Sequence, residues 1–428
     1  MPAQDRRGVL VLADDLSGAA EAAATLMSRG TRTELVLESA ARDAVLPPAN
    51  VLVVDLDDRE RTPGEAASRT RELLSALPTG TPSPRVMTKI DSLLRGNLAA
   101  RLGVLHDRGG VVVAPALPVL RRVVRDGVLS IDGAPLSGTR AWVTQGVPAP
   151  DTVAAACAPL PTVLLRLPTV RSDRLSTAVA EAVRNGLVPI CDGETDADLD
   201  AVVAAVAALS PELPDVALVG SAGLAAALGR TWSAAPGAPP PPRPDSPGPL
   251  LVVGTAEQTA AVQVARLVDA GVREVRLPAA ALLSPASDAS ADARLATALA
   301  AGPVVIRPDP AAPLAPADSR RLSAGLGDLV GRALTRLSGP VDLVLTGGET
   351  ARRVLDALGV TRLTPLGQVH HGAVLCRMPD GASVVTRPGS FGGPDSLLSI
   401  LAALHARPRP HQPPLTTASV RGSTEGTP

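Results

Sequence analysis

The chain has 428 residues, of which 45% are hydrophobic and 19% charged, as is typical of a globular protein with two or three domains. Its 41 basic and 42 acidic residues give a formal net charge of -1, so no overall field favours nucleic acid or an anionic membrane. With no tyrosine, one phenylalanine and two tryptophans, the chain also lacks the aromatic platforms on which single-stranded nucleic acid stacks.

The first residues, MPAQDRRGVLVLADDL, place aspartates directly after a short apolar run, unlike a signal peptide or a membrane anchor. No apolar stretch approaches the ~20 residues of a membrane span. Three scattered cysteines, Cys157, Cys191 and Cys376, form neither a CxxC pair nor a disulfide framework, and we interpret them as reduced, structural thiols. These features predict a cytoplasmic protein.

In the first half of the chain, short β-branched runs alternate with Ala- and Leu-rich helical stretches. This rhythm is typical of βαβ units and predicts a largely parallel sheet flanked by helices. Between residues 122 and 136, two Asp-Gly turns beside alternating residues predict instead a β-hairpin excursion. The expected strands are 9–12, 51–54, 86–89 and 111–114, and the expected helices include 19–28 and 65–77.

The second half repeats this pattern after a proline-rich segment. Eight of the fourteen residues between 236 and 249 are proline, which predicts an extended spacer. The sequence from about residue 406 lacks apolar periodicity and is predicted to be disordered. The expected strands are 251–253, 304–307 and 341–345, and the expected helices are 258–269, 319–337 and 350–358. We therefore expect an α/β protein with domains at 1–233 and 250–405, a linker at 234–249 and a tail at 406–428.

Two aspartates follow the first predicted strand, at the kind of position where open parallel sheets bind ligands. Asp14 and Asp15 are succeeded by Ser17, Gly18 and a helical stretch. Two adjacent carboxylates there can accept hydrogen bonds from a polyol, and one can take a proton from an attacking hydroxyl. Helix capping explains one of these aspartates but hardly both, so we favour a functional role.

A second polar cluster, KIDSLLRGN at residues 89–97, follows another predicted strand. Lys89 and Arg95 are suited to hold a carboxylate, and Asp91 and Ser92 suit sugar hydroxyls. The alternative is that Asp91 and Arg95 form an i,i+4 ion pair on a solvated helix face. The density of polar residues in the cluster favours a binding site.

Two glycine-rich loops, TGGET at 346–350 and TRPGSFGGP at 386–394, lie in the second half. Glycines let the backbone approach a phosphate, and a helix N-terminus directs free N–H groups at it. Either loop alone fits a mere connection, but together they predict a nucleotide cradle. The chain has no HExxH, no Walker lysine loop and no serine elbow. We expect no metal site built by the protein, and Mg²⁺ arrives with the nucleotide.

Taken together, these motifs resemble those of the four-carbon acid sugar kinases, which include threonate, erythronate and 3-oxo-tetronate kinases. ADDLSGA at 13–19 and KIDSLLRGN at 89–97 are similar to that family's ADDLTGA and KTDSTLRGN. GGETA at 347–351 and TRPGSFG at 386–392 are similar to its GGDTA and TKSGGFG. Further similarity lies at 113–136, 192–199 and 219–228, so the matches run in order from about residue 8 to about residue 400.

The resemblance implies transfer of the γ-phosphoryl group of ATP to the 4-hydroxyl of a tetronic acid or its 3-oxo form. It implies an acid-sugar-binding domain before the linker and a nucleotide-binding domain after it. The balanced charge and scarce aromatics predict no nucleic-acid or membrane partner, and a homodimer is one expectation for the assembly. The expected catalytic residues are Asp15, Lys89 and Asp91, and the expected acid contacts also include Asp14, Ser92, Arg95 and Asn97. The nucleotide is expected to contact Thr255, Gly347, Gly348, Glu349, Thr350, Arg387 and Gly389.

The sequence departs from the family pattern in the nucleotide half. The family's Gly-Ser-x-Ser loop reads Gly254-Thr255-Ala256-Glu257 here, which keeps a hydroxyl but adds a negative charge. Arg387 replaces a lysine, and Glu349 is one methylene longer than the usual aspartate. These departures leave an alternative function open, namely a non-catalytic acid-binding or regulatory protein whose nucleotide loops have drifted.

Overall fold

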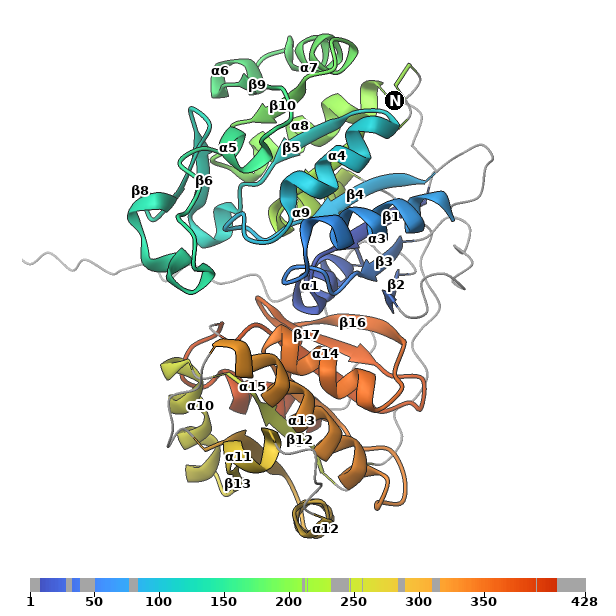
Figure 1. Cartoon of the computed structure of the whole chain (residues 1–428), viewed down its shortest axis with the longest axis vertical. Helices are drawn as coiled ribbons and strands as arrows, with labels where there is room; N and C mark the ends of the chain where they lie inside the picture. The colour runs from blue at the N-terminus through green and yellow to red at the C-terminus, as the bar shows by residue number, and fades with distance from the viewer. Residues whose placement is uncertain are drawn as a thin grey trace, which may run out of the picture.

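The computed structural model describes residues 8–27, 33–38, 51–76, 84–209, 212–213, 215–231, 246, 248–255, 257–283, 289–309, 316–389 and 391–405. Two bodies of strands and helices, one from each half of the chain, lie one above the other in Figure 1. The predicted two-domain α/β fold is confirmed. Most of the predicted linker and the whole predicted tail lie outside the described residues.

In the described part of the first half, eight parallel strands run in the order β2-β3-β1-β4-β11-β5-β10-β9. All five residues of β1 are buried, as expected for an apolar run in the middle of a parallel sheet covered on both faces. The strands are β1 (Val9–Ala13), β2 (Thr33–Leu37), β3 (Val51–Asp55), β4 (Arg85–Lys89), β5 (Val111–Ala114), β9 (Thr162–Leu165), β10 (Val188–Cys191) and β11 (Ala217–Gly220). The helices are α1 (Leu16–Met27), α3 (Pro63–Ser75), α4 (Leu98–Arg108), α5 (Val153–Cys157), α6 (Leu167–Val170), α7 (Leu175–Arg184), α8 (Asp196–Leu209) and α9 (Ala222–Thr231).

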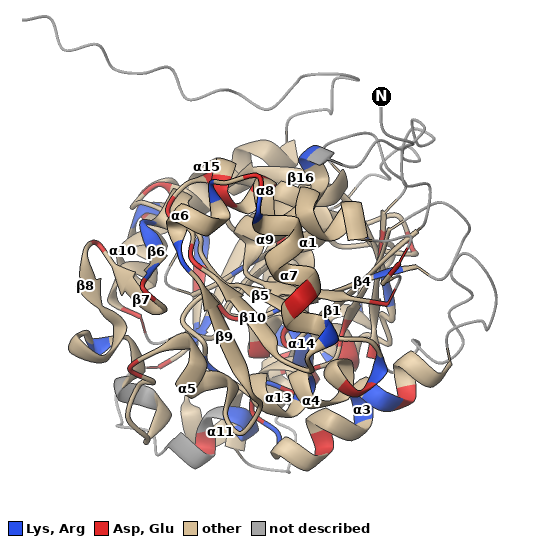
Figure 2. Cartoon of the chain, turned by 90° about the horizontal axis from the view of Figure 1, so that it is seen from above, with Lys and Arg blue, Asp and Glu red and all other residues tan. Residues whose placement is uncertain are grey.

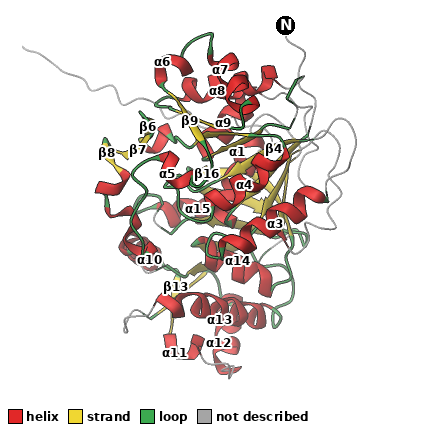
Figure 3. Ribbon diagram, turned by 45° about the horizontal axis from the view of Figure 1, so that its top comes forward, coloured by secondary structure: helices red, strands yellow, loops and turns green. Residues whose placement is uncertain are grey.

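The sheet of the second half runs β13-β14-β12-β15-β18-β17-β16, and its last two strands are antiparallel to their neighbours. The strands are β12 (Leu250–Val253), β13 (Arg273–Leu277), β14 (Val304–Pro308), β15 (Leu343–Thr346), β16 (Arg362–His370), β17 (Ala373–Arg377) and β18 (Ser383–Arg387). The helices are α10 (Gln258–Asp269), α11 (Ala279–Leu283), α12 (Ala289–Ala300), α13 (Pro316–Leu334), α14 (Gly348–Ala357) and α15 (Ser396–His405). Figure 3 shows helices on the outside of the strands in both halves.

Strand β12 shows how this second sheet is buried on both faces. Leu250 and Val252 belong to the core cluster that contains residues of α13 and α14, whereas Leu251 and Val253 belong to the cluster of α10 and α15. Successive side chains of a strand point to opposite faces, so α13 and α14 cover one face and α10 and α15 cover the other. The continuous apolar run that predicted a buried strand therefore has a layer of helices on each side.

The two sheets are joined edge to edge into one sheet of fifteen strands. Strand β16 pairs antiparallel with β2, with Leu363 opposite Leu35 and Arg362 opposite Val36. Beyond this pair, the Leu37 N–H donates to the Thr361 carbonyl at 2.9 Å. Neither β2 nor β16 was among the strands predicted from sequence.

Ion pairs also connect the two halves. Arg352 of α14 donates from Nη1 to Oδ2 of Asp55, the last residue of β3, at 2.9 Å, and both side chains are buried. Arg353 donates to Oδ2 of Asp57 at 2.9 Å. Because breaking one partner of a buried ion pair leaves an uncompensated charge, these contacts fix how the halves sit on each other.

The predicted β-hairpin excursion is confirmed. Strands β6 (Arg122–Arg125), β7 (Val128–Ile131) and β8 (Ala134–Pro135) form a separate antiparallel sheet. Asp126 and Gly127 turn between the first two strands with φ values of 49° and 75°. Two successive positive φ values define the type I′ turn that Asp-Gly favours.

Several expectations from composition can be compared with this structure. No helix in the described part of the chain is long and apolar enough to cross a membrane. The three cysteines are unpaired and buried, and burial raises the pKa of each thiol to about 12. Acidic and basic residues are interspersed over the fold in Figure 2, in keeping with the balanced composition.

Candidate active site

The carboxyl ends of β3, β1 and β4 lie at one level of the first sheet. Ala13, the last residue of β1, is in register with Asp55 of β3 and with Lys89 of β4. Polar residues that follow the three strands therefore meet at one edge of the sheet. This register brings together the two segments singled out from sequence, and it adds a third, residues 55–61.

Arg59 of this third segment binds both predicted aspartates. Its Nε and Nη2 donate to the two oxygens of Asp14, each at 2.9 Å, and its Nη1 donates to Oδ2 of Asp15 at 2.8 Å. Burial alone would raise the pKa of Asp14, but the guanidinium outweighs it and holds that pKa below its usual value. Sequence reasoning missed Arg59 because DLDDRER resembles a solvated run of charges; its position directly after a strand was the available signal.

Asp91 and Arg95 form an ion pair in the turn that precedes α4. Arg95 donates from Nε and Nη2 to the two carboxylate oxygens at 2.7 and 2.9 Å. Burial would raise the pKa of Asp91, but the hydrogen bond from Arg95 and the charge of Arg59 lower it well below its usual range. The i,i+4 pair considered from sequence therefore exists, although it lies in a loop rather than on a helix face.

The remaining residues of the second cluster differ in exposure and contacts. Lys89 is only 4% exposed, and its Nζ donates to the Ile90 carbonyl at 3.1 Å and lies 3.8 Å from Oε2 of Glu21. Ser92 accepts a hydrogen bond from Arg122 of the hairpin. Asn97 uses its amide nitrogen to hold the loop after β3, donating to the Asp58 and Arg61 carbonyls at 2.8 and 2.9 Å.

The predicted nucleotide loops meet at the carboxyl ends of β12, β15 and β18. Thr346 of β15 is in register with Val253 and with Arg387, so the segments after these strands are neighbours. A Cβ on Gly389 would lie 2.7 Å from the Thr255 hydroxyl, which shows how closely two of these loops approach. The structure thus brings Thr255, Gly347, Gly348, Thr350 and Gly389 together.

Helix α14 begins in this group of loops with a free N-terminus. Gly347 stands at the N-cap with φ 97°, a conformation that favours glycine, and no side chain caps the helix. The first N–H groups of such a helix and its partial positive charge form an anion site. Glu349 in the first turn does not cap the helix, because its carboxylate accepts from Arg353 at 2.8 Å.

Arg387 is fully buried beneath the second glycine-rich loop. It donates from Nη1 to the Ser396 hydroxyl at 2.7 Å and from Nη2 to the Gly389 carbonyl at 3.3 Å. Among the described residues no carboxylate pairs with it, and burial lowers its pKa to about 10. Its guanidinium therefore supports the loop from below.

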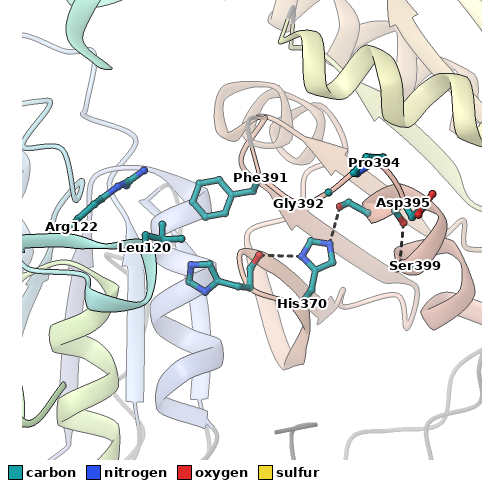
Figure 4. A pocket seen from close by; sticks show the side chains of 11 residues that line it. Leu120, Arg122, His370, Phe391, Gly392, Pro394, Asp395 and Ser399 are labelled. Atoms are coloured by element: carbon teal, nitrogen blue, oxygen red, sulfur yellow. Dashed lines mark hydrogen bonds between the residues drawn. The ribbon is translucent and has the colours of Figure 1, made fainter. Parts of the chain in front are cut away.

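Two cavities lie where the halves meet. The smaller, about 220 Å³, is lined by Asp14, Asp15 and Arg59 from the first half and by Gly348 and Glu349 from the second. The larger has a volume of about 760 Å³ and places Leu120 and Arg122 opposite the loop of residues 391–396 (Figure 4). Both cavities therefore have walls from both halves.

No group of three or more histidine, cysteine, aspartate or glutamate side chains in the described ranges could hold a metal ion. His370 and His371 line the larger cavity, but His370 is hydrogen-bonded to Ser396 and to the neighbouring backbone. Asp15 and Glu349 present carboxylates to the smaller cavity, and each is paired with an arginine, so a metal there would need most of its ligands from a phosphate.

Comparison with known proteins relates the first half of the chain to sugar-binding domains and the second half to nucleotide-binding domains. Residues 9–228 match the family described as "Sugar-binding N-terminal domain", and residues 250–397 match "Nucleotide-binding C-terminal domain". A D-threonate kinase from Cupriavidus necator is 36% identical over 91% of this chain and 96% of its own. The chain belongs to the four-carbon acid sugar kinase family. A 3-oxo-tetronate kinase from Methylobacterium radiotolerans is 29% identical over 90% of this chain and 96% of its own.

The fold of this four-carbon acid sugar kinase also has a solved counterpart. A crystal structure of a Salmonella typhimurium LT2 protein superimposes with a TM-score of 0.74 over 92% of this chain and 98% of that one, at 21% identity. Of the departures noted from the family pattern, Glu257 is exposed at the start of α10, and its N–H donates to Thr255 at 3.2 Å. The threonine hydroxyl thus supports the loop in which the family carries serine.

Proposed function

We propose that the chain transfers the γ-phosphoryl group of ATP to the 4-hydroxyl of a four-carbon sugar acid. The observation that carries this proposal is the meeting of Gly348, at the uncapped start of α14, with Asp15 of the acid-binding half. Phosphoryl transfer requires mainly positioning of the two reactants and neutralisation of charge. A phosphate held at the helix start lies next to a hydroxyl held by Asp15.

In this mechanism Asp15 accepts the proton of the attacking hydroxyl. The new bond joins the hydroxyl oxygen to the γ-phosphorus, the bond from that phosphorus to the β,γ-bridging oxygen breaks, and ADP leaves. Arg59 orients the Asp15 carboxylate through its 2.8 Å contact. Mg²⁺, bound with the nucleotide, supplies neutralisation of the phosphate charge.

Lys89, Asp91 and the polar residues after β4 complete the acid site. A Cβ on Gly18 would lie 2.8 Å from Asp15 Oδ1 and 3.0 Å from Lys89 Nζ, so acid and base groups face each other across a glycine. Lys89 therefore stands where it can balance charge that develops during transfer. Asp91, held ionised by Arg95, is suited to accept hydrogen bonds from substrate hydroxyls.

The glycine-rich loops are proposed to hold ATP. Thr255, Gly347, Gly348, Thr350 and Gly389 gather around the start of α14, which supports a phosphate site there. Thr350 is buried and contacts Ser323 at 3.4 Å, so its contribution is to shape the loops. Glu349 faces the smaller cavity beside Arg353, and Arg387 positions the loop of Gly389.

The test is ATP consumption with threonate, erythronate and 3-oxo-tetronate, each in both enantiomeric forms where they exist. ADP release that depends on one of these acids supports the proposal. Acid binding without any ATP consumption would instead support the non-catalytic alternative. Light scattering in the same buffer tests the predicted homodimer, and fractionation of the native host tests the predicted cytoplasmic location.

A further inference from the structure

The protein's own groups already engage Lys89 and Arg95, which were predicted to hold the substrate carboxylate, and also Arg59, which the structure places beside them. Arg95 is held at two points by Asp91, and Arg59 is shared by Asp14 and Asp15. Lys89 donates to a backbone carbonyl and lies near Glu21. Each of these cations has a carboxylate of the chain within 4 Å, so none offers an uncompensated charge to an acidic ligand.

Arg122 differs from them. It belongs to β6 of the hairpin, is half-buried, and donates from Nη1 to the Ser92 hydroxyl. Its Nε is buried without a hydrogen-bond partner, and no carboxylate in the described ranges forms an ion pair with it. Burial lowers the pKa of Arg122, and the nearby Asp91 only partly offsets that effect. A half-buried guanidinium with an unused donor is a costly arrangement unless an anion completes it.

The surroundings of Arg122 indicate which anion this is. The residue lines the larger cavity opposite Phe391, as Figure 4 shows. Its hydrogen-bond partner Ser92 follows Asp91 in the polar cluster of residues 89–97, so the guanidinium borders the proposed acid site. A phosphate of ATP could also satisfy an arginine, but the nucleotide loops approach the first half at Asp15 and Ser17, through Gly348.

We propose that Arg122 binds the carboxylate of the sugar acid and makes the enzyme select acids over neutral polyols; this rests on the proposed function. The guanidinium offers a fork of N–H donors that matches a carboxylate, and Ser92 fixes the orientation of that fork. The hairpin, which is otherwise peripheral to the sheet, then serves to carry a specificity residue to the interface.

The test compares Arg122→Gln with wild type in steady-state kinetics. We expect the KM for the acid to rise about 100-fold, because a charge-assisted bidentate contact is lost, while the KM for ATP changes less than about threefold. Preference for the acid over threitol or erythritol, which keep the hydroxyls but lack the carboxylate, should fall by a similar factor. Arg121→Gln is the matched control, since Arg121 is 80% exposed and pairs with Asp132.

The outcomes separate this proposal from the function on which it rests. An unchanged acid KM, or a rise confined to the ATP KM, overturns the role of Arg122 while the kinase stands. If none of the acids supports ATP consumption by wild type, the proposed kinase function is wrong. Calorimetric titration of the acid into wild type and Arg122→Gln then still decides whether Arg122 binds the acid. Should Arg122→Gln not fold, Arg122→Lys keeps the charge and should raise the acid KM about tenfold through loss of the fork.

Discussion

A Cβ atom on Gly348 would lie 3.0 Å from Oδ2 of Asp15 and 3.1 Å from the Ser17 hydroxyl. The backbone of Gly348 at the start of α14 therefore lies directly against the side chains of Asp15 and Ser17, and no side chain of α14 separates them. An ionised carboxylate facing a helix N-terminus is an attractive arrangement, because the helix dipole is positive at that end. A phosphate bound at the helix start would replace Asp15 as the anion that faces the helix.

Gly348→Val should remove activity by closing this contact. The branched side chain meets Asp15 and Ser17, and it either separates the halves or displaces the catalytic carboxylate. We expect kcat/KM to fall at least about 100-fold, the loss that a misplacement of about 1 Å can cause. Gly103→Val is the control, since a Cβ at that helical glycine meets nothing within 4 Å. Undiminished ATP affinity in Gly348→Val by calorimetry would sink the assignment of this loop.

Asp15→Asn should lower kcat about 1,000-fold while the protein stays folded, because an amide cannot accept the hydroxyl proton. Stopped assays of ADP release measure the loss, and circular dichroism checks the fold. Asp173→Asn, at an exposed position, should behave as wild type. Activity within tenfold of wild type would remove Asp15 as the base.

Lys89 needs a different substitution, Lys89→Met, because its side chain is buried.

Arg387→Lys should weaken ATP binding although it conserves the charge. The guanidinium reaches both Ser396 and the Gly389 carbonyl, and an ammonium in the same place cannot serve both. We expect the Kd for ATP, measured by calorimetry, to rise about tenfold, the effect of losing one charged hydrogen bond. Arg266→Lys, at an exposed site on α10, should leave it unchanged. If Arg387→Lys binds ATP normally, the residue acts as a simple cation.

The buried Asp55 predicts a dependence of stability on pH. Burial raises the pKa of Asp55 to about 7, against the opposing charge of Arg352. Between about pH 4, the ordinary value, and pH 7 the native protein keeps a proton that the unfolded chain has released. The stability that Asp55 contributes is therefore complete below about pH 4 and is lost as the pH rises through 7.

Urea titrations of wild type and Asp55→Asn at pH 4.5, 6 and 7.5 test this sign. The free energy of unfolding of wild type relative to Asp55→Asn should decrease from the first pH to the last, since asparagine does not titrate. A difference that grows with pH would mean that Arg352, at 2.9 Å, keeps Asp55 ionised throughout.

Much of the fold follows from local sequence, because its central strands are continuous apolar runs. The run VLVLA of β1 and the helix of residues 258–269 both occur where the pattern predicts them. Strands β2 and β16 were missed because each pairs with a strand of the other half, and a partner so far along the chain leaves no local signal in the sequence. The polar Arg362 and the glycine at 367 hide β16 in the sequence.

The site was predictable where a strand end coincides with an unusual density of polar residues. Asp14, Asp15 and the cluster after β4 met that condition, and the structure places them side by side. Arg59 and Arg122 did not stand out, because arginine is common in loops and hairpins and only the fold shows what each guanidinium faces. The Asp91–Arg95 ion pair was one of the alternatives that the sequence offered, but nothing in the sequence indicated that Asp14 and Asp15 would neutralise Arg59.

The pairing of β2 with β16 means that each half of the chain protects an edge of the other. Alone, the first half would present the unpaired backbone of β2 and the second that of β16, and such edges recruit further strands. Each would also lose one partner of a contact that is buried in the whole chain, Arg352 being missing from one fragment and Asp55 from the other. The proline-rich segment therefore connects two halves whose strands already form one hydrogen-bonded sheet. Truncation to a single half should yield aggregated protein rather than a folded, active domain.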